Sequence, residues 1–288
     1  TDYNVRPNLP TSASLNNWYY LDLDTSTKNL AKLSLKLTDG TQDIQYDPNL
    51  PNINLTIENE NLTIQNNVIL KSGKADVTYT FSQDNVSGYL KFKQTAAEVS
   101  AEVKMGDFDL LQKLINDNDD VFELTRDYTY DISDTITEGI LIDKRITING
   151  NGYTIDAKGK SRIFYITGNQ VTLNNVTLKN GKIEGEGAAI FWSGQEGNLK
   201  SSVIVNNTGT SAVYWDATGG DINNCIILNN SGMDIISTTS DLKVDYNWFG
   251  NNASNYISDA PNVVGVTLNN WYFLDIELYS SNAIITLS

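Results

Sequence analysis

The chain has 288 residues, a formal net charge of −15, one cysteine and no histidine. Without histidine, Ser-His-Asp and Cys-His catalytic sites are excluded and the commonest zinc ligand is missing. Acidic residues outnumber lysine and arginine by 35 to 20, which disfavours nucleic acids and anionic membranes as partners.

Composition also indicates the fold class. The chain contains 36 asparagines, many in pairs, and asparagine favours tight turns and tolerates left-handed backbone. No run of 18 apolar residues occurs, so we expect no direct membrane insertion. We expect an all-β chain, with an immunoglobulin-like sandwich followed by a short right-handed parallel β-helix that carries an N-terminal capping helix.

The two ends of the chain share a motif. The segment SLNNWYYLDLD begins at Ser14, and TLNNWYFLDIE begins 253 positions later at Thr267. The fragment DYN at Asp2 recurs at Asp245, in the same order relative to the longer motif. Such self-similarity predicts one period of a longer array. Residues 1–13 would then end the preceding repeat, and residues 261–288 would form a linker and the first strands of the next sandwich.

Residues 14–105 contain short segments of alternating polarity separated by turn residues. About seven strands in ninety residues are typical of an immunoglobulin-like sandwich. The chain has a single cysteine, so no disulfide clamps this region. Its stability would rest on inward side chains, which we expect to include Trp18, Leu35, Ile57, Tyr79 and Phe92.

Residues 106–120 follow as an expected capping helix. Phe108, Leu111, Leu114 and Ile115 recur at helical spacing, and Asp107 suits the cap position. Such a helix would cover the open end of the β-helix, because an exposed sheet end pairs with other chains. The acidic run from Asn116 to Asp120 is a candidate site for a structural calcium ion, although a solvated helix end is the simpler interpretation. We expect no other cofactor and no other metal.

Residues 121–260 are expected to form the parallel β-helix. Aligned Leu173, Leu199, Ile222 and Leu242 are separated by 26, 23 and 20 residues, and a companion series keeps the first two steps from Phe164 to Ile190 to Val213. Coils of this length with Asn and Gly turns are typical of a β-solenoid, in which each coil covers the next.

The alternation within the coils predicts which side chains point inward. Two apolar columns should face inward. The first consists of Phe164, Ile190, Val213 and Met233, and the second consists of Ile166, Trp192, Trp215 and Ile235. A second wall should bury Val203 with Ile226 and Val205 with Leu228. At the following bend, Asn180, Asn207 and Asn230 are expected to form a ladder of side-chain amides.

Between the two inward columns stands an outward one, made of Tyr165, Phe191 and Tyr214 and ending in Asp234. These three aromatic residues are our candidate ligand-binding site, because exposed aromatic rings contact sugars or apolar residues of a partner. The alternative is a stack that only reinforces the wall.

The chain resembles the adhesin-like surface proteins of methanogenic archaea, in which immunoglobulin-like domains alternate with parallel β-helices. The resemblance is carried by LNNWYYLDLD, by the run from Ile146 to Gly168, by the LNNVTL and NNCIILNN coil motifs, and by DYNWFGNN. It implies an extracellular segment of a larger anchored surface protein that attaches to a glycan or protein of another cell. It implies no catalytic residues.

Seven Asn-x-Ser/Thr sequons agree with a glycosylated surface protein, and they lie at Asn54, Asn61, Asn85, Asn175, Asn206, Asn229 and Asn252. In a chain rich in Asn, Ser and Thr, several of them arise by composition alone. Cys225 lies in a coil, and we interpret it as a small half-buried residue rather than a reactive thiol.

An enzyme remains an alternative, because polysaccharide-degrading enzymes also use the parallel β-helix. The solenoid offers acids at Asp156, Asp216, Asp221, Asp234, Asp241 and Asp245, with bases at Arg145 and Arg162. Asp221 and Asp241 are expected to stack in neighbouring coils, and a pair of carboxylates suffices for glycoside hydrolysis. We expect a non-catalytic adhesin segment; the alternatives are a β-helix enzyme and a purely structural cell-wall or S-layer stalk.

Overall fold

The computed structural model describes the strands between residues 20 and 104, all of residues 105–250, and residues 261–268 and 270–272. Before residue 103, side chains are described at only a few positions. The chain divides into two compact units, one comprising Thr1–Leu110 with Asp131–Thr135 and the other Leu111–Tyr130 with Ile136–Ser288.

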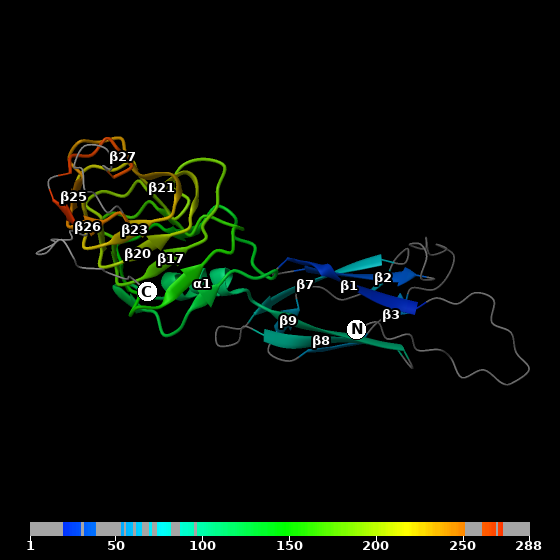
Figure 1. Ribbon diagram of the computed structural model, residues 1–288. Helices are drawn as coiled ribbons and strands as arrows, with labels where there is room; N and C mark the ends of the chain where they lie inside the picture. The colour runs from blue at the N-terminus through cyan, green and yellow to red at the C-terminus, as the bar shows by residue number, and fades with distance from the viewer. Residues whose placement is uncertain are drawn as a thin grey trace, which may run out of the picture. The chain divides into compact units, whose positions relative to one another are not determined.

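The described strands of the first unit form three antiparallel sheets (Figure 1). The largest has the order β1 (Tyr20–Asn29), β2 (Lys32–Thr38), β7 (Lys74–Phe81) and β5 (Leu62–Ile64). The second orders β4 (Thr56–Asn59), β8 (Ser87–Gln94) and β9 (Ala97–Lys104), and β3 (Ile53–Asn54) pairs with β6 (Ile69–Leu70). The expected strands are therefore present in this unit.

Few side chains of this unit can be compared with the expected core. Phe92 is fully buried, as predicted, and so are Leu90 and Val103. The other expected core positions lie outside the described side chains, and they are Trp18, Leu35, Ile57 and Tyr79.

Helix α1 (Asp107–Asn116) follows β9 and is shorter than the expected span of 106–120. Phe108, Leu111 and Ile115 are buried at helical spacing along one side. At its start, the carboxylate of Asp134 accepts hydrogen bonds from the backbone N–H groups of Phe108 (2.8 Å) and Asp109 (3.0 Å). A helix leaves its first N–H groups without partners inside the helix, so Asp134 caps α1 from a distant part of the chain.

The second unit is a parallel β-solenoid whose coils each contribute one short strand to three sheets (Figure 1). The first face consists of β10 (Val121–Glu123), β13 (Thr147–Asn149), β16 (Thr172–Asn174), β19 (Asn198–Lys200), β22 (Asp221–Asn223) and β25 (Lys243–Asp245). The second face consists of β11 (Tyr128–Thr129), β14 (Thr154–Asp156), β17 (Thr177–Lys179), β20 (Val203–Val205), β23 (Ile226–Leu228), β26 (Asn247–Trp248) and β28 (Trp271–Tyr272). The third face consists of β12 (Ile140–Ile142), β15 (Phe164–Ile166), β18 (Ile190–Trp192), β21 (Thr208–Trp215), β24 (Ser231–Ser237) and β27 (Val263–Val264). The expected parallel β-helix is confirmed, with about six turns.

The core of the solenoid is a set of apolar columns that run from coil to coil. On the first two faces the middle residue of each strand is buried, as in the column of Ile148, Leu173 and Leu199. On the third face the first and third residues of β12, β15 and β18 are buried instead, and Trp192 of β18 stacks on Trp215 of β21 with ring centroids 4.5 Å apart. Neighbouring coils are thus held by burial of apolar side chains.

Two expected columns are wrong in the same coil. In the structure Val213 pairs with Ile235 and Trp215 with Ser237, so Met233 does not continue the first column and Ile235 does not continue the second. On the first face Ile222 pairs with Val244 rather than with Leu242. The last full coil is two residues longer than the assumed step, and a register shift between Thr208 and Ser211 interrupts β21. Leu242 is itself buried, so the apolar pattern alone offered two registers.

The inner side of the second face also differs from the expectation. Ile204 and Ile227 point inward and are fully buried. The residues expected inside are half-buried on the outer side, and they are Val203, Val205, Ile226 and Leu228. The runs Val-Ile-Val and Ile-Ile-Leu contain no polar residue, so they do not indicate which side faces inward.

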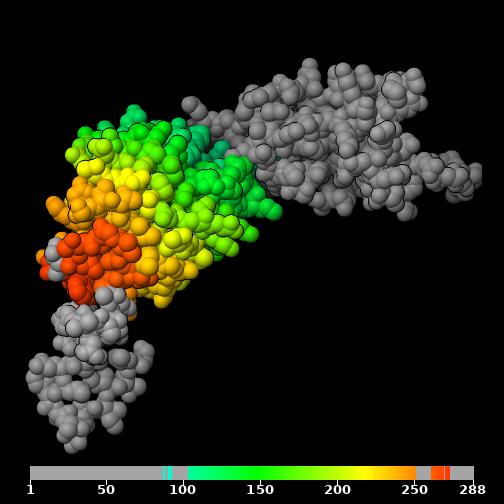
Figure 2. Space-filling view, turned by 90° about the horizontal axis from the view of Figure 1, so that it is seen from above, coloured from blue at the N-terminus to red at the C-terminus, as the bar shows by residue number. Residues whose placement is uncertain are grey.

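The solenoid continues past residue 260, where the prediction ended it. Strand β27 pairs in parallel with β24, and β28 pairs in parallel with β26. In Figure 2 the residues near the end of the described chain, in red, lie at one end of the stacked coils. The Trp-Tyr pair of the repeated LNNWY motif therefore belongs to a solenoid coil.

The bends between strands explain the abundance of asparagine. In the part of the chain that the structure describes, eleven residues other than glycine have positive φ, and six of them are asparagines. Asparagine adopts left-handed backbone more readily than most residues with a side chain. In register, Asn180 corresponds to Asn206 and Asn229, which all have φ between 55° and 58°.

The expected amide ladder is present in part. The side-chain amide of Asn207 donates to the side-chain oxygen of Asn230 at 3.0 Å. Asn180 does not join them, because its amide donates to Asp156 in the preceding coil and the residue in register with Asn207 is Gly181. The buried Asn207 side chain accepts the Gly181 N–H (2.7 Å) and donates to the Leu178 carbonyl (3.3 Å).

We expect Asn207→Ala to destabilise the solenoid by about 2–4 kcal/mol, because it removes the side-chain acceptor of the buried Gly181 N–H and the bonds to the Leu178 carbonyl and to Asn230. The neighbouring Asn206 is the matched control: it is exposed and has φ 58°. Glycine adopts that backbone without strain, so Asn206→Gly should change stability by less than about 0.5 kcal/mol. Denaturant midpoints of the two variants test the expectation, and equal shifts would contradict it.

Gly197 lies against the tryptophan stack. A Cβ atom at this position would lie 2.3 Å from the Trp192 ring. We expect Gly197→Ala to destabilise the chain by about 3 kcal/mol, since the ring has no room to move within a packed core. At Gly185 a Cβ would meet nothing within 4 Å, so Gly185→Ala should leave the thermal midpoint unchanged. A Gly197→Ala variant with the same thermal midpoint as the wild type would contradict this expectation.

Candidate functional site

The predicted outward aromatic column is a continuous stack on the third face. Tyr165 and Phe191 have ring centroids 4.9 Å apart with planes 15° from parallel, and Phe191 and Tyr214 are 5.0 Å apart with planes at 35°. All three side chains are half-buried. At these distances the rings stack on one another, so the faces of Phe191 are directed at its two neighbours.

The column extends further than predicted and has a different end. Leu141 precedes Tyr165 in register and is 39% exposed. Ile236 follows Tyr214, and Val264 follows Ile236 with 47% exposure. Asp234, the expected end of the column, is buried and lies outside it. The outward column is therefore apolar over six coils.

Arg162 fixes one side of this stack. Its guanidinium lies 5.4 Å from the centroid of Tyr165 and 5.3 Å from that of Phe191. It donates hydrogen bonds to the backbone carbonyls of Glu138 (2.9 Å), Glu186 (3.1 Å) and Gly187 (2.9 Å). Cation–π contacts of this kind are strongest where the cation is desolvated, and Arg162 is only 7% exposed. Arg162, which was considered as a catalytic base, therefore has its guanidinium engaged in structural contacts.

Tyr214 at the far end of the three rings has a polar neighbour. Burial, the negative charge of Glu186 and a hydrogen bond between the two side chains raise the pKa of the Tyr214 phenol above its ordinary value. The phenol therefore stays protonated at physiological pH. The three-ring stack carries a tyrosine hydroxyl at each end, on Tyr165 and on Tyr214, with Phe191 between them.

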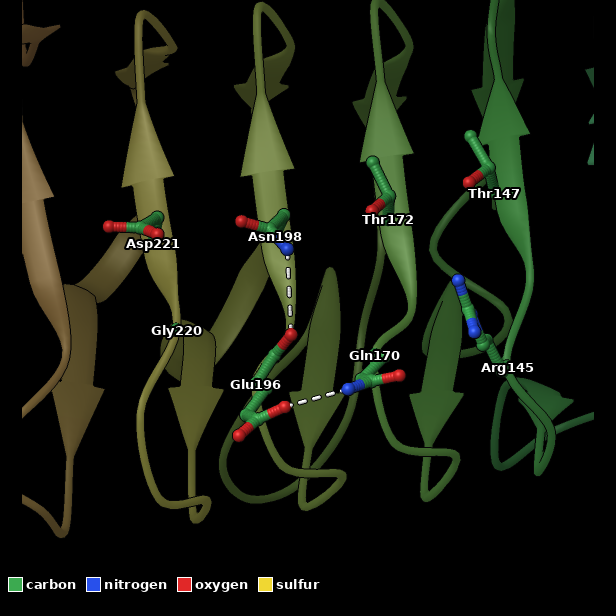
Figure 3. A pocket seen from close by; sticks show the side chains of 8 residues that line it. All are labelled: Arg145, Thr147, Gln170, Thr172, Glu196, Asn198, Gly220 and Asp221. Carbon is green, nitrogen blue, oxygen red and sulfur yellow. Dashed lines mark hydrogen bonds between the residues drawn. The ribbon is translucent and has the colours of Figure 1, made fainter.

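A second surface feature lies on the first face, and sequence reasoning did not identify it. An open groove of ≈ 530 Å³ crosses four coils and is lined by Arg145, Thr147, Gln170, Thr172, Glu196, Asn198, Gly220 and Asp221. Figure 3 shows Thr147, Thr172, Asn198 and Asp221 in one row, one from each strand, with Arg145, Gln170 and Glu196 beside them. We call this surface the polar groove.

Much of the hydrogen-bonding capacity of the polar groove is unused. Gln170 donates to the Glu196 carboxylate at 2.8 Å, and the Asn198 amide is 3.4 Å from the Glu196 carbonyl. Within the described part of the chain, the side chains of Arg145, Thr172 and Asp221 form no hydrogen bond to protein. The sequence signal was the first position of each strand, which is threonine, threonine, asparagine and aspartate in successive coils.

The acids considered for catalysis do not form one cluster. Asp221 lies in the polar groove, but its in-register neighbour in the next coil is Lys243, so the expected stack of Asp221 on Asp241 is wrong. Asp241 is exposed and accepts the Gly219 N–H at 2.8 Å. Asp216 is exposed and accepts a hydrogen bond from the Thr238 hydroxyl at 2.6 Å.

The remaining acids are buried or half-buried at separate points. Asp156 is 3% exposed and pairs with Lys158 (3.1 Å) and Lys179 (3.5 Å). Asp245 is half-buried on the first face, and one of its carboxylate oxygens is buried without a hydrogen-bond partner. Asp234 is 9% exposed and accepts one hydrogen bond from the Asn230 amide.

The acidic run considered for calcium lies at the end of α1. Asp117 pairs with Lys113 at 2.6 Å, and Asp119 pairs with Lys144 at 3.6 Å. Lys144 also donates to the carbonyl of Asn116. Among the described residues, no group of three acidic, cysteine or histidine side chains is placed to hold a metal ion.

Three predicted glycosylation positions can be located. Asn175, Asn206 and Asn229 are exposed at left-handed bends, where an attached sugar would meet solvent. Asn54 lies in β3 with an undescribed side chain, and Asn61, Asn85 and Asn252 lie outside the described residues. Their modification stays a prediction.

Cys225 is more deeply buried than expected, at 1% exposure. Burial raises the pKa of its thiol to about 12, so the nucleophilic thiolate is scarce at physiological pH. It therefore offers no reactive thiol.

Comparison with known protein families, curated proteins and solved structures finds no match to this chain. Across the described residues, none of the helices has the length and apolar character needed to span a membrane.

The buried Asp234 predicts a pH-dependent stability. Burial raises its pKa from the ordinary 3.8 to about 6, so the folded state binds a proton more tightly than the unfolded state. Stability therefore falls as pH rises from about 4 to about 6, by up to about 3 kcal/mol from this group. Asp234→Asn removes this loss, so the variant should exceed the wild type in stability at pH 7.5 and approach it at pH 4. Denaturant unfolding at both pH values measures the difference, and a difference independent of pH would contradict the assignment.

Proposed function

We propose that this chain is a non-catalytic segment of a cell-surface adhesin, in which the solenoid displays a binding surface and the first unit acts as a spacer. The observation that carries the proposal is the outward aromatic column Tyr165–Phe191–Tyr214. Its rings are held by stacking and by Arg162, so little side-chain freedom is lost when a partner binds. An apolar column flanked by polar bends suits contact with apolar residues of a partner or with the C–H face of a sugar.

The spacer is proposed to be an immunoglobulin-like sandwich. Support comes from the antiparallel pairing of β1 with β2, of β2 with β7 and of β8 with β9, and from the burial of Phe92 and Val103. Sandwiches of this kind are built from such strands in antiparallel sheets.

Helix α1 is proposed to cap the solenoid. The side-chain amide of Gln112 accepts the Leu141 N–H at 2.6 Å and donates to the Leu141 carbonyl at 2.9 Å. Gln112 thereby satisfies two backbone groups of β12, the first strand of the third face, which would otherwise remain open to pairing with another chain.

The proposed location is the extracellular surface of a cell, within a larger anchored protein, and the proposed partner is a glycan or protein on another cell. The resemblance to adhesin-like proteins of methanogenic archaea supports this location. So does the exposure of the three described sequon asparagines, which leaves them accessible to glycosylation.

One observation favours the alternative of a polysaccharide-degrading enzyme. Glu196 and Asp221 line the same groove, and glycoside hydrolysis requires two carboxylates on either side of the scissile bond. Release of reducing ends from a bound polysaccharide would favour this alternative over adhesion.

Adhesion is tested with beads that carry the purified chain and are incubated with a panel of archaeal and bacterial cells. We expect Phe191→Ser with Tyr214→Ser to lower bound cells by about tenfold, since two apolar contacts of the column are removed. Val203→Ser with Ile226→Ser is the matched control, because these residues are also apolar, outward and half-buried but belong to the second face. Circular dichroism verifies that both variants fold.

Either of two results would overturn the proposal. The first is that wild-type beads retain no more cells than beads carrying an unrelated protein. The second is that the two double variants bind cells equally well.

A further inference from the structure

The three faces of the solenoid differ in the chemistry of their outward side chains. On the third face the outward column is apolar from Leu141 to Val264, and on the second face Val203 and Ile226 point outward. The first face is polar at the outward positions of all four strands from β13 to β22, and they are Thr147, Asn149, Thr172, Asn174, Asn198, Lys200, Asp221 and Asn223. The polar groove lies on this face alone, so its lining is specific to one side of the coil.

The polar groove repeats its hydrogen-bonding groups at the spacing of the coils. Thr147, Thr172 and Asn198 occupy the same position in three adjacent parallel strands. Neighbouring strands lie about 4.8 Å apart, which is close to the length of one sugar unit in an extended glycan. A linear ligand that lies across the strands would therefore meet an equivalent side chain at each successive unit.

The groups that line the groove match hydroxyl-rich ligands. A threonine hydroxyl and an asparagine or glutamine amide each both donate and accept hydrogen bonds, as a sugar hydroxyl does. Thr172 has no protein partner for its side chain within the described residues, and Gln170 uses only its amide N–H toward Glu196. These groups are half-buried or exposed, so a ligand in the groove can reach them.

The charges in the groove favour a neutral ligand. Arg145 lies at one end, whereas Glu196 and Asp221 lie toward the other. One cation among two anions, on a chain of net charge −15, would repel a polyanion such as a polyuronate. A polycation would meet only two carboxylates, one of which already accepts the Gln170 amide.

We propose that the polar groove binds an extended neutral glycan that runs across the strands of the first face, one sugar unit per coil from Thr147 to Asp221. This inference rests on the proposed function, because both treat the solenoid as a non-catalytic display surface. It adds a second binding surface, distinct from the aromatic column on the third face, and it names the class of ligand.

The test begins with an array of neutral and acidic glycans, followed by titration calorimetry with the neutral glycans that bind, prepared as oligosaccharides of two to six units. Binding confined to neutral linear glycans is expected. Affinity should rise with each unit up to about four, the number of coils that the groove crosses, and then level off. Binding of acidic glycans only, binding of no glycan, or affinity independent of chain length would each overturn the proposal.

Variants locate the binding on the first face. Thr172→Val with Asn198→Leu keeps the shape of the groove and removes two hydrogen-bonding groups, so affinity should fall about tenfold or more. Thr154→Val is the matched control, because Thr154 is also a half-buried threonine at the first position of a three-residue strand, in the same coil as Thr147 but on the second face. It should bind within twofold of the wild type. Equal losses in the two proteins would place the ligand elsewhere.

Cell retention and glycan binding are measured separately, so loss of the glycan groove can be distinguished from loss of adhesion. If the groove double variant retains cells as well as the wild type and no glycan binds, the chain remains an adhesin without a glycan groove. If glycans bind as expected but beads retain no cells, the groove stands and adhesion fails. Reducing ends released from a bound oligosaccharide, and lost in Glu196→Gln, would replace a binding groove by an enzyme site.

Discussion

Backbone groups at the bends between coils must find hydrogen-bond partners, because there the chain leaves the parallel ladders of the three faces. Asparagine side chains meet this requirement. Asn207 accepts the Gly181 N–H, Asn230 accepts the Asn207 N–H, and Asn247 accepts the Cys225 N–H, each from the following coil. Asn207 and Asn247 have no exposed surface, so their amides form these bonds in a medium of low dielectric constant. The asparagine pairs thus combine a left-handed bend with a bond between coils.

The same bonds determine what the surface can present. Coils held in register place equivalent positions above one another, so a residue type repeated in the sequence becomes a column on the surface. On the third face this produces the stack of Tyr165, Phe191 and Tyr214, and on the first face it produces the row of Thr147, Thr172 and Asn198. The two proposed binding surfaces therefore depend on one packing arrangement, although they differ in chemistry and in face.

Much of this fold could be predicted from the sequence. Steps of 26 and then 23 residues correctly placed Phe164, Ile190 and Val213 in one column and predicted the outward aromatic stack. This succeeded because polar turns mark both ends of these segments. The prediction was wrong where pattern and packing diverge: Leu242 and Val244 are both buried, and Val-Ile-Val carries no polar residue to mark its outer side. The polar groove was missed because Arg145 and Asp221 are 76 positions apart in the sequence and only the register of four coils brings them to one groove. Asp134 as the cap of α1 depends equally on a contact between distant residues.

Hydrogen exchange measured by NMR tests directly whether asparagine side chains bond one coil to the next at the bends. The N–H groups of Gly181, Asn207 and Cys225 lie outside the strands. We expect them to exchange as slowly as the N–H groups of the adjacent strand residues Ile204 and Ile227, through unfolding of the whole solenoid. Exchange of the three bend N–H groups at rates typical of exposed loops, with the strands still protected, would contradict it.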